Sequence, residues 1–94
     1  MFNGLVYYSG SVDSNRSSAG FSVSKTGTGT YEITLNDGGN NAYIISATAE
    51  CGGAGTPVVI MTDYNTNDTY FAIRTYNLNG QLINNTFHFV VYRK

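Results

Sequence analysis

Apolar and polar residues alternate with a period of two along much of the chain. In the stretch GTYEITL, the apolar residues Tyr31, Ile33 and Leu35 alternate with polar ones. In AGFSVSK, Phe21 and Val23 alternate with serines. Successive side chains of a β-strand point to opposite faces of a sheet, so this pattern indicates strands with one face on a core and the other in water.

Five further runs are rich in β-branched and aromatic residues, and turn-forming stretches separate them. The runs are GLVYYSGSV, AYIISATAE, PVVIMTDY, TYFAIRTYN and TFHFVVYR, and the separators include KTGTG, NDGGNN, CGGAGTP, NTND and NLNG. No stretch has the 3.6-residue period of a helix. The sequence therefore predicts an all-β protein, an antiparallel and jelly-roll-like β-sandwich of seven to eight strands, in a single domain over residues 1–94.

Two connections can be predicted in more detail. The polar stretch GSVDSNRSSAG indicates a surface loop between the first and second strands. Asn79 and Gly80 lie between the last two runs, and Asn-Gly is a strong signal for a tight hairpin turn. We therefore expect a terminal hairpin in which this turn folds the last strand into the sheet beside its predecessor.

Composition excludes two classes of partner. Charged residues make up 12% of the 94-residue chain and the net charge is −1, so we expect no nucleic-acid partner, which would need a basic surface. The apolar runs are far shorter than the roughly 20 residues of a spanning helix, so we expect no membrane insertion. The single cysteine, Cys51, has no basic neighbour, and we interpret it as a buried, unreactive thiol.

Signals for catalysis are weak throughout the sequence. His88 is the only histidine, and no nucleophile motif accompanies it. It lies between two phenylalanines in a predicted strand, and we interpret it as a structural histidine at an interface or on the second face of a sheet. The six carboxylates form no recognisable catalytic pair. We predict a protein that is not an enzyme and that has no catalytic residues, no metal and no cofactor.

The stretch DYNTND partly matches a calcium-binding loop. Asp63, Asn65 and Asn67 occupy alternate positions, as in the first half of an EF-hand loop. The sixth position, however, is Asp68 where glycine is needed, and the twelfth is Arg74 where glutamate is needed. We therefore interpret this stretch as a turn rather than as a metal site.

The same turn is the candidate ligand surface. Tyrosine combines an apolar ring with a hydroxyl group, which suits subunit interfaces and stacking against sugars. An Asn/Asp turn between tyrosines offers both hydrogen bonding and stacking. The candidate ligand-binding residues are Tyr64, Asn65, Asn67, Asp68 and Tyr70.

The last run, TFHFVVYR, carries bulky side chains on both faces. Strict alternation places Phe87, Phe89 and Val91 on one face. A small sandwich normally exposes the second face of a strand to solvent, and an apolar second face indicates a covering partner. We therefore predict a homo-oligomer, with a trimer favoured, whose interface includes the residues of that second face. These residues are His88, Val90 and Tyr92.

The order of these segments resembles small β-sandwich domains at the C-terminal ends of bacteriophage tail-fibre and head-fibre proteins, and related domains of bacterial surface proteins. The matching motifs are G-x-Y-x-(I/V)-x-(F/L) at 29–35, F-x-(I/V)-x-T-x-N-x-x-G at 71–80 and F-x-F-x-V-Y at 87–92. The resemblance covers roughly residues 19–94. Its motifs are structural, and no ligand residue transfers with them.

The resemblance implies a trimeric knob at the tip of a virion fibre, exposed on the particle surface. Such a tip attaches to a host receptor, for example a cell-surface glycan, and has no enzymatic activity. The repetitive shaft of such a fibre is missing from this sequence, so the chain is either a fragment or a free-standing version. Two alternatives stay open: a lectin-like carbohydrate-binding module, and a purely structural trimerisation or capping domain.

Overall fold

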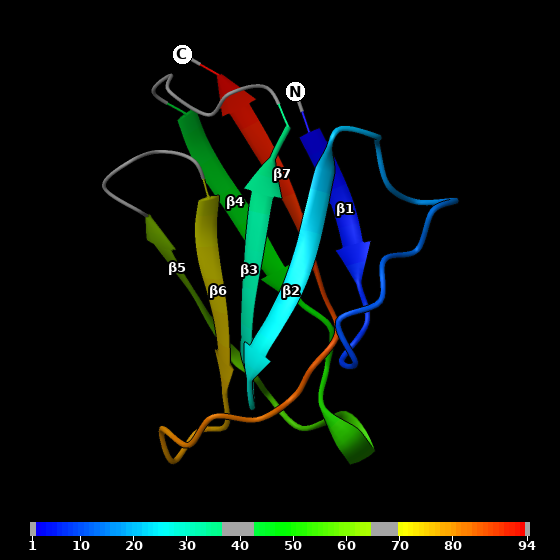
Figure 1. Cartoon of the computed structure of the whole chain (residues 1–94). Coiled ribbons are helices and arrows are strands. Elements are labelled where there is room, and N and C mark those ends of the chain that lie inside the picture. The colour runs from blue at the N-terminus through cyan, green and yellow to red at the C-terminus, as the bar shows by residue number, and fades with distance from the viewer. Residues whose placement is uncertain (1, 37–42, 65–69, 94) are drawn as a thin grey trace.

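The chain forms two antiparallel β-sheets packed face to face. The computed structural model describes residues 2–36, 43–64 and 70–93. A three-stranded sheet has the order β1-β7-β4 and a four-stranded sheet the order β2-β3-β6-β5, one in front of the other in Figure 1. The strands are β1 (Phe2–Val6), β2 (Phe21–Gly27), β3 (Thr30–Leu35), β4 (Tyr43–Ala49), β5 (Val59–Tyr64), β6 (Tyr70–Tyr76) and β7 (Phe87–Arg93). Each of the seven runs read from the sequence overlaps one strand, so the predicted antiparallel β-sandwich is confirmed.

The core lies between the sheets and is centred on aromatic rings. Phe89 makes edge-to-face contacts with Phe21 and Phe71, with ring centroids 5.1 and 5.8 Å apart. A Cβ atom at Gly4 would approach the rings of Phe21 and Phe89 to 2.6 and 2.8 Å, so glycine is required there. The fully or nearly fully buried apolar residues are Val6, Tyr31, Ile33, Leu35, Phe71, Ile73, Phe87, Phe89 and Val91.

The last strand is the central strand of the three-stranded sheet. Phe89 lies opposite Gly4 of β1 on one side and opposite Ala47 of β4 on the other. The hydrophobic end of the chain is therefore paired along both edges and packed on the core. This position explains why so apolar a segment lies close to the C-terminus.

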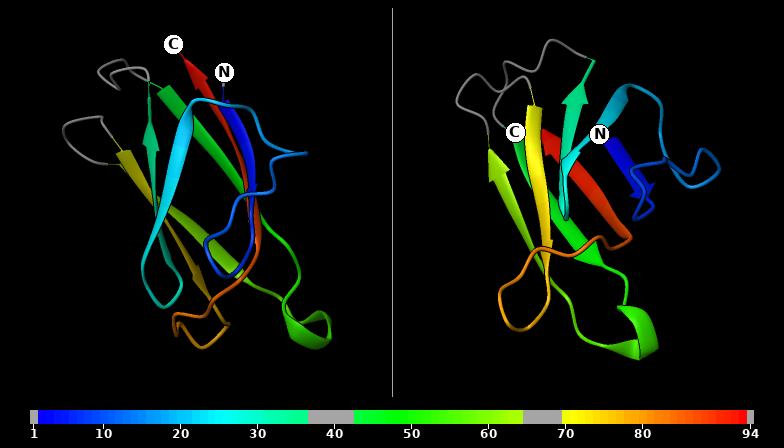
Figure 2. Two further views of the ribbon diagram at one scale, coloured as in Figure 1. Left: turned by 45° about the vertical axis from the view of Figure 1, so that its right-hand side comes forward. Right: turned by 60° about the horizontal axis from the view of Figure 1, so that its bottom comes forward.

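The expected terminal hairpin is wrong, because β6 and β7 belong to different sheets. The tight turn exists: Gly80 has φ +79° and donates its N–H to the carbonyl oxygen of Asn77 at 3.1 Å. After it, the chain stays beside β6 briefly, through a bridge from Leu82 to Tyr76 and a hydrogen bond from the Ile83 N–H to the Thr75 carbonyl oxygen at 3.0 Å. The chain then crosses to the other sheet (Figure 2), and the Thr75 hydroxyl holds the crossing by donating to the Ile83 carbonyl oxygen at 2.6 Å.

The predicted surface loop before β2 lies along the outer edge of β1. The backbone N–H groups of Asn3 and Leu5 donate to the hydroxyls of Ser18 and Ser17, each at 3.0 Å. The Leu5 carbonyl oxygen accepts the N–H of Asp13 at 2.9 Å. Serine hydroxyls and loop backbone thus replace a neighbouring strand. An exposed sheet edge is a template for unwanted pairing, and this loop closes it.

Candidate binding surface on the three-stranded sheet

The outer face of the three-stranded sheet carries the residues predicted for the subunit interface. His88 and Tyr92 are exposed and Val90 is half-buried, whereas Phe87, Phe89 and Val91 are buried. The predicted division of this strand into two faces is therefore confirmed. The cross-strand rows on the outer face are Asn3–Val90–Ser46, Leu5–His88–Thr48 and Tyr92–Ile44.

One end of this face is a shallow, open depression of about 480 Å³. It crosses β7 from the β1 edge to the residue that follows β4. The lining residues are Asn3, Gly4, Leu5, Arg16, Glu50, His88, Phe89 and Val90. The lining therefore combines side chains that can donate or accept hydrogen bonds, here called the walls, with the apolar side chains of Leu5 and Val90, here called the floor.

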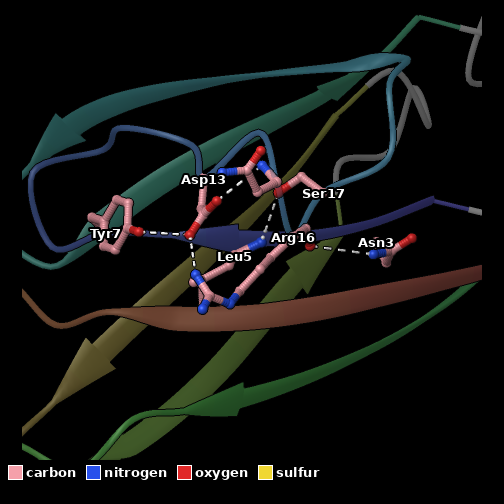
Figure 3. A network of polar contacts seen from close by, with 7 residues as sticks. Asn3, Leu5, Tyr7, Asp13, Arg16 and Ser17 are labelled. Carbon is pink, nitrogen blue, oxygen red and sulfur yellow. Dashed lines mark hydrogen bonds and ion pairs between the residues drawn. The ribbon is translucent and has the colours of Figure 1, made fainter.

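A buried carboxylate positions Arg16 at the rim of the depression (Figure 3). Asp13 is 8% exposed, and its Oδ2 accepts hydrogen bonds from the Tyr7 hydroxyl at 2.6 Å and from Arg16 Nη1 at 2.7 Å. Its Oδ1 accepts the backbone N–H of Asn15 at 3.0 Å. The hydrogen bond from Tyr7, followed by that from Arg16, holds the pKa of Asp13 below its usual value. The same bond to Asp13 raises the pKa of Tyr7.

A second buried polar group positions Glu50 on the opposite side. Asn85 is 7% exposed and donates its side-chain N–H to the Glu50 carbonyl oxygen at 2.7 Å. The Glu50 N–H donates to the Thr86 carbonyl oxygen at 2.9 Å. The backbone of Glu50 is therefore fixed on both sides while its side chain is exposed.

This polar surface was not predicted from the sequence. Asp13 was considered only as one of the six carboxylates, and Arg16 was assigned no role. The one local signal is the segment DSNR, because an Asp side chain in a loop often accepts the backbone N–H two residues on, in an Asx-turn. Glu50 and Arg16 reach the same depression because β1, β7 and β4 pair in that order. This strand order could not be predicted from the sequence.

The other end of the face is apolar. Tyr92 is 49% exposed and its cross-strand neighbour Ile44 is 67% exposed. Val90 lies two residues before Tyr92 on the same face and joins the two ends. The surface is thus divided into a polar depression and an apolar end.

Of the residues predicted for ligand binding, the two that the structure describes, Tyr64 and Tyr70, lie apart from this surface. Tyr64 is the last residue of β5, and Tyr70 is the half-buried first residue of β6. Both strands belong to the other sheet, so these positions are not joined to the depression. Asn65, Asn67 and Asp68 lie outside the described residues.

The described part of the DYNTND stretch forms an ion pair. Asp63 Oδ2 lies 2.7 Å from Arg74 Nη1, which places a cation where a calcium loop needs a carboxylate. Within residues 2–36, 43–64 and 70–93, no three His, Cys, Asp or Glu side chains group as metal ligands would. The prediction that this stretch is a turn stays a prediction, because its centre is not described.

The prediction that Cys51 is a buried thiol is wrong, because Cys51 is exposed. It follows β4 and precedes the short 3₁₀ helix η1 (Gly53–Gly55), so it lies in a surface connection rather than on the inner face of a strand.

These features define a small antiparallel β-sandwich with a mixed polar and apolar surface on its three-stranded sheet. Comparison with protein-family descriptions, curated proteins and solved structures finds no match to this chain. The described residues contain no helix long and apolar enough to span a membrane.

Proposed function

We propose that this protein is a non-enzymatic attachment domain at the tip of a virion fibre or a similar appendage, where it associates with copies of itself, with a trimer favoured. One observation carries the proposal: the outer face of the central strand β7 continues into an exposed apolar end. Tyr92 and Ile44 lie side by side there, and Val90 adjoins them.

The physical argument concerns the cost of leaving this surface in water. Ile44 keeps about two-thirds of its surface exposed, at 67%, on the same face as Tyr92. Burial of apolar area stabilises association by roughly 25 cal/mol per Å² before the entropic cost of binding is subtracted. The inner face of β7 packs on the core. A partner on its outer face would therefore contact the central strand of the sheet, which is paired along both edges.

The association can be tested with two matched substitutions. Ile44 and Leu78 are 67% and 69% exposed, and Leu78 lies in the remote Asn77–Gly80 turn. Sedimentation velocity at micromolar concentration should show a trimer for the unmodified chain and for Leu78→Glu, and a folded monomer for Ile44→Glu. A monomeric unmodified chain would refute self-association, and an assembled Ile44→Glu variant would place the interface elsewhere.

A second candidate function is a lectin-like binding module, alone or combined with the first. The polar depression favours it, because buried partners hold the side chain of Arg16 and the backbone of Glu50. A purely structural capping domain would have no use for such a depression. Measured binding of a saccharide separates these alternatives.

A further inference from the structure

The depression on the three-stranded sheet has walls that are fixed before any ligand arrives. Arg16 is bound by Asp13, and the backbone of Glu50 is bound by Asn85 and by the Thr86 carbonyl oxygen. Both buried side chains end at the edges of the core, and each holds one wall residue. The Arg16 side chain is held in advance and therefore loses less conformational entropy on binding, which favours affinity, whereas the Glu50 side chain moves on a fixed backbone.

The floor and the walls offer different chemistry. Leu5 and Val90 are half-buried, and they supply apolar surface to the same lining as the polar residues. Arg16 can only donate hydrogen bonds, a carboxylate such as Glu50 accepts them, and an amide such as Asn3 does both. His88 adds one further donor or acceptor. A ligand that fits must have hydroxyl groups at its edge and C–H groups on its face.

The charges of the depression argue against an ionic ligand. The positive charge of Arg16 is balanced by Asp13 at 2.7 Å, and Glu50 remains as an exposed carboxylate. An anion would meet no unpaired arginine. A cation would find one solvated carboxylate, and exposed ion pairs of that kind contribute little. A neutral, polyhydroxylated ligand fits the donors and acceptors without either difficulty.

We propose that this depression binds a neutral saccharide, with Arg16, Glu50, Asn3 and His88 as hydrogen-bonding residues and Leu5 and Val90 beneath the sugar ring. Its biological use in attachment rests on the proposed function above. At about 480 Å³ the depression lies within the usual range for small-ligand sites. Because it is open, we expect a dissociation constant in the millimolar range for one sugar unit, and several linked copies would raise the avidity.

The experiment is a titration followed by the ¹⁵N–¹H spectrum of the full chain. The neutral probes are glucose, galactose, mannose, fucose and N-acetylglucosamine, each to about 100 mM, well above the expected constant. Glucuronate and glucosamine serve as anionic and cationic comparisons. We expect one or more neutral sugars to shift the amides of Asn3, Leu5, Arg16, Glu50 and His88, and both charged probes to shift them less.

A matched pair of variants tests the role of Glu50. Glu50→Gln keeps the backbone contacts of this residue. It should raise the dissociation constant of the best neutral probe about tenfold, because a charge-assisted hydrogen bond becomes a neutral one. Glu32→Gln makes the same change on the outer face of the four-stranded sheet and should leave binding unaltered.

Any one of four results would overturn the proposal. No shifts with any neutral probe, shifts spread over the chain, stronger binding of glucuronate or glucosamine, or equal effects of the two variants would each exclude this saccharide site. Sedimentation without sugar reports on self-association separately. A monomer that binds sugar at the depression would refute the assembly but keep the site, and a trimer without shifts would do the opposite.

Discussion

The two faces of β7 differ more than their sequence suggests. Phe87, Phe89 and Val91 are at most 1% exposed, and Phe89 touches aromatic rings of two other strands. On the outer face, the equally bulky Tyr92 is 49% exposed. Both sets of side chains are bulky, but only the inner set is fully buried within the described chain.

The difference shows how one strand can serve the fold and a surface at once. The inner face fixes the position of β7 between β1 and β4. The outer face then presents its residues at fixed spacing, on a backbone that is paired along both edges. Substitutions on the two faces should therefore affect different properties, and the following predictions test this separation.

The largest effect is expected on the inner face. Phe89→Ala should reduce the free energy of unfolding by about 3–5 kcal/mol, because it removes a buried ring and leaves a cavity between Phe21 and Phe71. In a domain of this size that loss approaches the whole stability. Phe89→Asp should leave the chain unfolded. Urea unfolding followed by circular dichroism measures both, and a cooperative transition near that of the unmodified chain would contradict the central place of Phe89.

A smaller effect is expected at the crossing that leads into β7. Gly29 has φ +66°, and a Cβ atom there would lie 2.6 and 2.8 Å from the carbonyl oxygens of Ile83 and Thr75. Gly29→Ala should lower the free energy of unfolding by about 2 kcal/mol or more. The alanine would hold a strained positive φ, and the neighbouring backbone would also have to move away from its Cβ atom. Gly80→Ala, at φ +79° in open space, should cost only about 1 kcal/mol. Equal denaturant midpoints for the two variants would show that the crossing is not tightly held.

The fold was predictable from the sequence because its strands alternate clearly. The residues of β3 and β7 fall on the faces that the period of two assigns to them. The pairing partner of β7 was not predictable in the same way. Asn79-Gly80 does form a tight turn, but the segment after it stays beside β6 only as far as Ile83, which Thr75 binds. The next residue, Asn84, accepts the N–H of Gly29 as the chain crosses to the other sheet, and this contact joins residues distant in sequence.

The candidate surface was predictable only in part. Alternation placed His88, Val90 and Tyr92 on one exposed face. The depression depends on Arg16 and Glu50, which two buried polar side chains bring to it from separate loops. A single sequence does not show which polar residues in a loop will be buried. Asp13 therefore looked like any other carboxylate of a surface loop.

Acid titration should reveal the buried carboxylate beside the outer face. The pKa of Asp13 is lowered, mainly by the hydrogen bonds from Tyr7 and Arg16, so its contribution to stability is present above the ordinary carboxyl pKa. That contribution is lost as the pH falls through the lowered value, below about pH 4. Asp13→Asn should therefore lower the melting temperature at neutral pH, by less than Phe89→Ala does, and this difference should shrink in acid.

The control for this titration is the exposed ion pair on the other sheet. Asp63→Asn removes a carboxylate that lies 2.7 Å from Arg74 on an exposed surface. Exposed pairs contribute little, so its melting temperature should stay near that of the unmodified chain across the pH range. If Asp63→Asn and Asp13→Asn gave the same pH profile, the Asp13 network would be no more than a surface contact.

The smallest effect, and the most direct measure of the two faces, comes from neighbouring valines. Val91 is buried on the inner face and Val90 is half-buried on the outer face, and valine to threonine changes shape little at either. Val91→Thr should cost about 1–3 kcal/mol by placing a hydroxyl in the core. Val90→Thr should change the free energy of unfolding by less than about 0.5 kcal/mol when the chain is dilute and monomeric. Association adds stability that rises with the logarithm of chain concentration, so a cost of Val90→Thr that grows with concentration would show that copies of the chain cover this face. A cost that is as large as that of Val91→Thr in dilute solution would mean that the outer face is already part of the monomer's core, and the separation of the two faces would fail.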